Sequence, residues 1–211
     1  DEALLAAAQA GGRPTLRLYA WHGPWLSLGY AQALEPHRAE ACRGAGVGVV
    51  RRVTGGSAVL HGGDLTYAVA AAEDALPPGL EGSYALVARA LREALRTLGV
   101  PADAKVPTPT RGPAPFDCFA RVGLEEIEVR GRKLVGSAQR RAGGALLQHG
   151  SLRLGPDPPA AAVAAGRVEG VATSLAELGC DATEARVREA FCRGFEAVLG
   201  LPVRPGALTA P

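Results

Sequence analysis

Residues 131–141 read GRKLVGSAQRR and lie in the middle of the segment that decides the fold. That segment predicts three strands, at residues 124–129, 133–141 and 145–154. Turns at residues 130–132 and 143–144 separate them. Because short turns join strands that run in opposite directions, we expect an antiparallel meander. The three small residues 136–138 then lie in the central strand of this meander.

The rest of the chain alternates between strand and helix patterns. Period-two or β-branched runs predict further strands: 15–20, 47–52 and 57–69. The last of these runs is interrupted at Gly62 and Gly63. Together with the meander, this order of elements indicates a mixed α+β domain with an antiparallel sheet flanked by helices.

Two predicted helices carry capping signals. Leucine and valine at helical spacing predict a helix over residues 83–99, with Ser83 as its N-cap. A last helix is predicted over residues 184–199, where Asp181 and Glu184 form a capping pair.

Composition limits the function classes. The chain has 211 residues, of which 47% are hydrophobic and 21% charged, and it is expected to form a single domain over residues 1–211. A net charge of +2 gives no support for binding to nucleic acid or to an anionic membrane. No apolar run reaches the roughly 20 residues that a bilayer requires. The proline-rich stretches 106–115 and 155–159 are too short to separate domains. We expect a soluble monomer.

The cysteines indicate the compartment. Cys42, Cys118, Cys180 and Cys192 show neither the spacing of zinc ligands nor a dense disulfide pattern. No metal site is therefore expected. Free thiols fit a reducing cytosol, so we expect a cytoplasmic protein.

Four sequence blocks cover most of the chain: WLSLGYAQ at 25–32, RRVTGGSAVLH at 51–61, GRKLVGSAQRR at 131–141 and QHGS at 148–151. In sequence and order they resemble the blocks of the biotin/lipoate A/B protein ligase family, which attaches lipoate or octanoate to proteins. The resemblance implies a mixed, largely antiparallel sheet flanked by helices, related to class II aminoacyl-tRNA synthetase cores. It also leads us to expect an opening strand before Asp1 and no accessory C-terminal domain.

An acyl-transfer site of this kind requires small residues. Each methylene of an eight-carbon chain contributes about 0.8 kcal/mol when it is buried in an apolar slot. The acyl carbonyl requires donors aimed at its developing oxyanion. Residues 55–57 and 136–138 allow a ligand to approach backbone N–H groups closely. A lone Gly-Gly pair is more often a turn or a bulge, but the neighbouring Arg51, Arg52 and His61 favour a binding role.

The resemblance implies which residues bind the substrate. They are Arg51, Arg52, Gly55, Gly56, Ser57, His61, Gly136, Ser137, Ala138, His149 and Gly150. Ser57 stands where the family commonly has a third glycine, which is a mild departure. His149 is expected to line the pocket in a structural role.

Lys133 corresponds to the lysine that contacts the acyl carbonyl end in the family. Lys105 is the only other lysine in a chain rich in arginine, so the lysine indicates that a compact ammonium is required. At a desolvated site it can serve as a donor or a base.

Cys118 discriminates between the activities of the family. It stands fifteen residues before Lys133, where the cysteine-dependent octanoyltransferases carry a Cys-Phe pair. A nearby ammonium is expected to lower the pKa of this thiol and to prepare it for a thioester intermediate. A strand over residues 124–129 spans about 20 Å. Residues 117–123 must therefore fold back over the sheet if Cys118 is to reach Lys133.

The resemblance thus implies an octanoyltransferase that uses Cys118 and Lys133 and requires no cofactor. Its donor is expected to be octanoyl-acyl carrier protein, and its acceptor a lysine of a lipoyl domain or of the glycine cleavage H protein.

Three alternatives stay open. In an ATP-dependent lipoate-protein ligase, Arg51, Arg52 and Lys133 would hold a lipoyl-adenylate, with ATP and Mg²⁺ as cofactors. An amidotransferase between lipoyl-bearing proteins shares every feature of the sequence. A non-catalytic acyl-binding relative would keep the pocket without the reaction.

Overall fold

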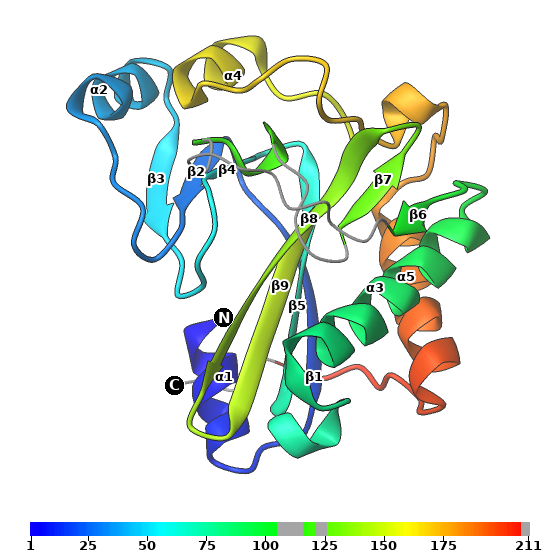
Figure 1. Cartoon of the computed structure of the whole chain (residues 1–211). Coiled ribbons are helices and arrows are strands. Elements are labelled where there is room, and N and C mark those ends of the chain that lie inside the picture. Colours follow the sequence, from blue (N-terminus) through cyan, green and yellow to red (C-terminus); the bar gives the residue numbers. More distant parts are fainter. Residues whose placement is uncertain (105–115, 121–125, 208–211) are drawn as a thin grey trace.

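Figure 1 shows the computed structural model of the chain, which describes residues 1–104, 116–120 and 126–207. Strands in these described ranges form a six-stranded antiparallel sheet and a three-stranded sheet. The larger sheet has the order β1 (Thr15–Ala20), β5 (Asp64–Ala72), β9 (Ala145–Arg153), β8 (Arg132–Ala142), β7 (Ile127–Val129) and β6 (Asp103–Ala104). The smaller has the order β3 (Gly48–Arg51), β2 (Trp25–Leu28) and β4 (Val59–His61), with β2 parallel to β3. The predicted α+β class is confirmed.

The central meander is present as predicted. At the β8–β9 turn, Gly143 and Gly144 have φ values of 57° and 73°. At the β7–β8 turn, Arg130 and Gly131 have φ values of 53° and 75°. Two successive residues with positive φ give the hairpin turn whose twist matches that of the flanking strands. The start predicted for the first strand, at residues 124 and 125, lies outside the described residues.

Helices cover both faces of the large sheet. In Figure 1, α3 (Gly79–Thr97) and α5 (Glu184–Leu199) lie side by side on one face. On the other face, α1 (Glu2–Gln9) contacts β5 and β9. Because both faces are covered, β5 is buried along nearly its whole length. The core against α3 and α5 includes Leu65, Tyr67, Leu91, Leu95 and Phe191.

Two helices that the sequence analysis did not predict cover the small sheet. α2 (Pro36–Gly44) and α4 (Pro159–Ala165) pack against each other and enclose a second core with Leu26, Leu28 and Leu60. Both helices are short, and both have a proline in their first turn, where its missing N–H is not required. Short 3₁₀ helices lie at Glu73–Ala75, Cys118–Ala120 and Ala176–Leu178.

Both predicted helix caps are wrong. Ser83 is not an N-cap, because α3 already begins at Gly79 and the Ser83 hydroxyl donates to the carbonyls of Gly79 and Leu80. Thr183, and not Asp181, caps α5, since its side chain accepts a hydrogen bond from the Arg186 N–H.

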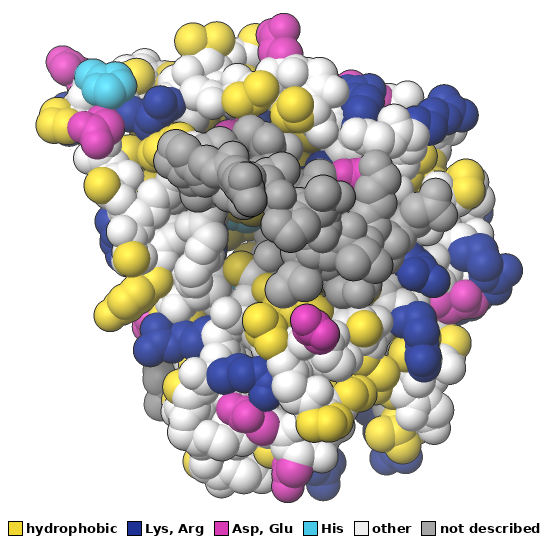
Figure 2. All heavy atoms as spheres, viewed as in Figure 1, with side chains coloured by type: hydrophobic (Ala, Val, Ile, Leu, Met, Phe, Trp, Pro, Cys, Tyr) yellow, Lys and Arg dark blue, Asp and Glu magenta, His cyan; other side chains and the backbone are white. Residues whose placement is uncertain are grey.

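The outer surface has no single-sign field on the face that Figure 2 draws. Lys and Arg side chains alternate there with Asp and Glu around the rim, which agrees with the small net charge of +2. Within the described residues, no helix is both long and apolar enough to cross a membrane.

The contact between α3 and α5 depends on Gly194. A Cβ atom at this position would lie 2.3 Å from the carbonyl oxygen of Ala90 and 2.9 Å from the N atom of Ala94. We expect Gly194→Ala to lower the free energy of unfolding by about 1–3 kcal/mol, the usual cost of overpacking. Alanine alone would favour a helix by about 1 kcal/mol over glycine.

Urea unfolding followed by circular dichroism measures this difference. Gly44→Ala, in a helix with open space around the same Cβ position, is the matched control and should not destabilise the chain. Equal stability of Gly194→Ala and the unaltered chain would show that the two helices can separate without cost.

Candidate active site

A bridge between distant segments places Cys118. The N–H of Ala58 donates to the carbonyl of Phe116 over 2.8 Å, and the N–H of Cys118 donates to the carbonyl of Ala58 over 2.8 Å. These bonds make a parallel bridge between Asp117 and Ala58. The 3₁₀ helix that starts at Cys118 therefore begins directly beside the glycine-rich block 55–57.

Lys133 reaches this segment from β8. Its Nζ donates to the carbonyl oxygen of Cys118 over 2.8 Å and lies 3.6 Å from the Cys118 Sγ. The same ammonium forms a buried ion pair with the carboxylate of Glu126. The predicted proximity of Cys118 and Lys133 is thus confirmed, although residues 121–125, through which the chain would fold back, lie outside the described residues.

Glu126 is a site residue that the sequence analysis missed. It stands just before β7, in a run of alternating residues where a carboxylate has no distinctive spacing. Its side chain is only 5% exposed, and that of Lys133 only 1%. A buried charge costs several kcal/mol unless it is paired, and Glu126 is one of the partners that offset this cost for Lys133.

The expected direction of the Cys118 pKa is wrong. Although part of the residue faces the cavity, burial of the thiol raises its pKa above the usual value, and the Lys133 ammonium only partly opposes this. The Glu126 carboxylate adds to the increase because its negative charge disfavours a thiolate nearby. For Lys133 the balance differs: burial alone would lower its pKa, but Cys118 and Glu126 together raise it. The resting pair is therefore a thiol beside an ammonium.

A buried ionic network supports the Cys118 segment from behind. Arg167 Nη1 lies 2.9 Å from Asp117 Oδ1, and Arg167 Nε lies 2.9 Å from Asp157 Oδ2. Arg153 Nη1 lies 2.7 Å from the same Asp157 oxygen. The Arg167 guanidinium also lies 4.8 Å from the centre of the Phe119 ring. The residues on both sides of Cys118 are thus fixed by charged contacts.

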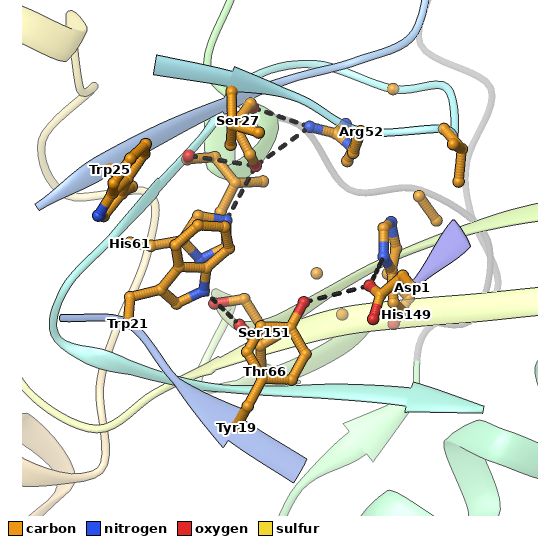
Figure 3. Close-up of a pocket in the computed structure, with 18 of the residues that line it drawn as sticks. Asp1, Tyr19, Trp21, Trp25, Ser27, Arg52, His61, Thr66, His149 and Ser151 are labelled. Carbon is orange, nitrogen blue, oxygen red and sulfur yellow. Dashed lines mark hydrogen bonds and ion pairs between the residues drawn. The ribbon is translucent and has the colours of Figure 1, made fainter. Parts of the chain in front are cut away.

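Cys118 opens into a cavity of about 790 Å³ between the two sheets. Figure 3 shows this cavity, with the aromatic side chains of Tyr19, Trp21 and Trp25 among its walls. The predicted site residues that line it are Arg51, Arg52, Gly56, His61, Cys118, Gly136, Ser137, Ala138, His149 and Gly150. Gly55, Ser57 and Lys133 do not line it. Ser57 instead accepts a hydrogen bond from Arg52 through its carbonyl, and Lys133 lies behind Cys118.

Two glycines leave little or no room for a side chain beside Cys118. A Cβ atom on Gly136 would lie 3.0 Å from the Lys133 Cε and 3.7 Å from the Cys118 Sγ. A Cβ atom on Gly150 would lie 2.4 Å from the Gly136 carbonyl oxygen and 2.6 Å from the Tyr67 ring. The hydroxyls of Tyr67 and Ser137 are 2.6 Å apart and complete this wall. Because Gly136 and Gly150 carry no side chains, this wall leaves space beside the Cys118 thiol.

The side chains of Arg51 and Arg52 form hydrogen bonds with backbone carbonyls. Arg51 Nη1 donates to the carbonyls of Gly29 and Gln32, each over 2.7 Å. Arg52 donates to the carbonyls of Gly55 over 2.8 Å and Ser57 over 2.7 Å. Burial lowers the pKa of Arg52, and the nearby Cys118 opposes this. Arg52 therefore shapes the glycine-rich block 55–57, and Arg51 fixes the segment 29–32 that follows β2.

His149 is held as a neutral side chain. Its Nε2 lies 2.6 Å from the Thr54 Oγ1, and its Nδ1 lies 2.8 Å from Asp1 Oδ2. Burial lowers the pKa of His149 to about 3, with Arg52 adding to the shift. These contacts agree with the structural, pocket-lining role that was predicted.

The charges around Cys118 give a prediction for its reactivity. Lys133→Met removes the charge that lowers the Cys118 pKa, so alkylation by iodoacetamide at pH 8 should become severalfold slower. Glu126→Gln removes a charge that raises that pKa, so alkylation should become severalfold faster. Peptide mapping by mass spectrometry gives the rate at Cys118 alone.

Arg193→Met is the control for loss of one cation, because its pair with Glu189 lies on the exposed surface of α5. It should leave the rate unchanged. If Lys133→Met and Glu126→Gln shift the rate in the same direction, disturbed packing and not charge controls the thiol.

Comparison with known proteins agrees with this site. The family described as the lipoyl protein ligase A/B catalytic domain matches residues 1–196. Octanoyltransferase LipM of Symbiobacterium thermophilum is 39% identical over 99% of this chain and 84% of its own length. Octanoyltransferase LipM of Kyrpidia tusciae is 40% identical over 100% of this chain and 85% of its own length.

Solved structures show the same architecture. A crystal structure of lipoate-protein ligase A bound with ATP has a TM-score of 0.81 and 26% identity, over 99% of this chain and 82% of that one. A lipoate protein ligase of T. acidophilum described as putative, with bound lipoic acid, has a TM-score of 0.82 and 26% identity over the same shares. The family match extends across both sheets and the cavity between them, and the chain belongs to the lipoyl protein ligase A/B catalytic domain family.

Proposed function

We propose that this chain transfers octanoate by way of a thioester on Cys118. The observation that carries the proposal is the Cys118 thiol, which opens into a cavity large enough for an acyl chain and lies 3.6 Å from the Lys133 ammonium. Relatives that are 36–40% identical over nearly the whole chain are octanoyltransferases, and this chain is an acyltransferase of that kind.

In the first step, the Cys118 sulfur attacks the carbonyl carbon of an octanoyl thioester. The Lys133 ammonium stabilises the thiolate that attacks and the negative charge that develops nearby. The C–S bond to the donor then breaks, and the leaving thiolate takes up the proton that Cys118 gave up. Because the resting thiol has a raised pKa, its proton must be given up as the C–S bond to the substrate forms, while the Lys133 ammonium favours the anionic sulfur.

In the second step, the amine of an acceptor lysine attacks the Cys118 thioester. An amide forms, the C–S bond breaks, and the thiol is restored with a proton from the amine. We infer that the donor is octanoyl-acyl carrier protein and that the acceptor is a lipoyl domain or the glycine cleavage H protein. Burial of the acyl chain contributes about 0.8 kcal/mol for each methylene, which the apolar walls of the cavity support.

This reaction consumes no nucleotide. A ligase of similar fold was solved with ATP, so an adenylate-forming reaction is the second candidate. It would use Arg51, Arg52 and Lys133 to hold the adenylate. Against it, Arg51 and Arg52 donate to backbone carbonyls, and Lys133 is paired with Glu126. An amidotransferase would use the same Cys118 thioester and differs only in its donor.

The covalent intermediate gives a direct test. Incubation with octanoyl-acyl carrier protein in the absence of ATP should add one octanoyl group to the chain, as measured by intact mass spectrometry. Cys118→Ala should abolish the adduct. Cys42→Ala, Cys180→Ala and Cys192→Ala are matched controls and should keep it. An adduct that persists in Cys118→Ala, or one that requires ATP, would contradict the proposal.

Gly136 tests whether the acyl carbonyl sits against the backbone of β8. Gly136→Val places methyl groups between the Lys133 side chain and the Cys118 sulfur, so acylation should slow by at least about a hundredfold, the scale for loss of an oxyanion donor. Valine suits a strand, so the fold should persist. Ala142→Val, near the end of the same strand, is the control. Unchanged acylation in Gly136→Val would place the acyl group elsewhere.

A further inference from the structure

A second set of reactive groups lies in the same cavity. Ser27 on β2, His61 at the end of β4 and Asp64 at the start of β5 form a chain of hydrogen bonds. The Ser27 Oγ lies 2.8 Å from His61 Nε2, and His61 Nδ1 lies 2.8 Å from Asp64 Oδ2. A hydroxyl, an imidazole and a carboxylate linked in this order are the arrangement that activates a serine as a nucleophile.

The carboxylate is fixed in its charged form. Burial alone would raise the pKa of Asp64, but hydrogen bonds from His61 and Ser151 hold it below its usual value. Ser151 donates to Asp64 Oδ2 over 2.6 Å, and the N–H of Gly62 donates to Oδ1 over 3.0 Å. An anionic Asp64 accepts only, so His61 carries its proton on Nδ1. In the neutral imidazole Nε2 is then the acceptor, and the Ser27 hydroxyl donates to it.

The imidazole is also fixed from the side. The Trp21 ring stacks on His61 with 4.2 Å between centroids and an interplanar angle of 17°. The indole N–H of Trp21 donates to Thr66 over 2.9 Å, and the Thr66 hydroxyl donates in turn to Asp64 over 3.1 Å. The orientation of His61 is therefore set by its carboxylate partner and by its stacking partner together.

The serine and the histidine both border the cavity. Figure 3 shows Ser27 between His61 and Arg52, with the interactions of all three meeting at the serine. Arg52 Nη1 lies 2.9 Å from the Ser27 carbonyl and 3.5 Å from its Oγ. The positive charge of this half-buried arginine lies beside the hydroxyl and favours the negative charge that develops when it gives up its proton.

We propose that Ser27, His61 and Asp64 form a second acyl-transfer centre, which hydrolyses medium-chain acyl esters and thioesters that enter the cavity. Ser27 Oγ attacks the acyl carbonyl while its proton passes to His61 Nε2. The bond to the leaving alcohol or thiol breaks, and the leaving group takes that proton. Water then attacks the Ser27 ester with His61 as base, which releases the carboxylic acid and restores the serine.

This centre shares no residue with the Cys118–Lys133 pair. Because water is its acceptor, it requires no acceptor amine. The two activities are therefore separable by substitution. The test uses Cys118→Ala, in which the proposed transfer is abolished, with 4-nitrophenyl octanoate and the octanoyl thioester of N-acetylcysteamine as probes.

In Cys118→Ala, release of 4-nitrophenol and of free thiol should exceed the rate in buffer. Adding Ser27→Ala, His61→Gln or Asp64→Asn should lower it by at least about a hundredfold, the scale of general acid–base catalysis. Ser174→Ala, the same change at a buried serine outside the cavity, is the control and should leave the rate unaltered. Hydrolysis at the buffer rate in folded Cys118→Ala would overturn the proposal.

Labelling gives a second measurement that leaves Ser27 in place. Octyl fluorophosphonate reacts with activated serines, so peptide mapping of Cys118→Ala should find the adduct on Ser27, and His61→Gln should remove it. An adduct on Ser137 or Ser151 instead, or none at all, would overturn the assignment. Because these outcomes are read without Cys118, they are distinct from failure of the proposed octanoyl transfer.

Discussion

The buried ion pair between Lys133 and Glu126 is the interaction on which the rest of the site depends. The backbone of Lys133 pairs with the segment around Ala172, since its N–H donates to the Val171 carbonyl over 3.0 Å and its carbonyl accepts from the Thr173 N–H over 2.9 Å. Its side chain joins the start of β7 to the Cys118 segment. A charge removed from water must have such partners. Lys133 thus joins three parts of the chain around the Cys118 sulfur, two through its ammonium and the third through its backbone.

Local sequence patterns were sufficient to predict the helices and strands that bury one regular face. The first strand and the last helix have the predicted bounds, Thr15–Ala20 and Glu184–Leu199, because the periodicity of their apolar residues is read within a few positions. α2 and α4 were missed because each is short and gains its stability from the other and from the small sheet. The start of α3 was misplaced since no side chain caps it.

The features of the site also divide into those that local sequence could predict and those that it could not. Family motifs carried Cys118, Lys133 and the glycine-rich blocks. No motif carried Arg167, which meets Asp117 from 50 residues away. Nor could the sequence give the direction of the Cys118 pKa, because an ammonium and the loss of water act against each other there. Which of the two prevails depends on how deeply the fold encloses the sulfur.

The raised pKa of Cys118 bears on how the protein withstands oxidants. Peroxides react with thiolates and only slowly with thiols, so a cysteine that stays protonated at rest is converted slowly to its sulfenic acid. Cys180 and Cys192 are also only partly buried, and none of these cysteines forms a disulfide. The enclosure that raises the pKa of Cys118 therefore also protects its sulfur from oxidation.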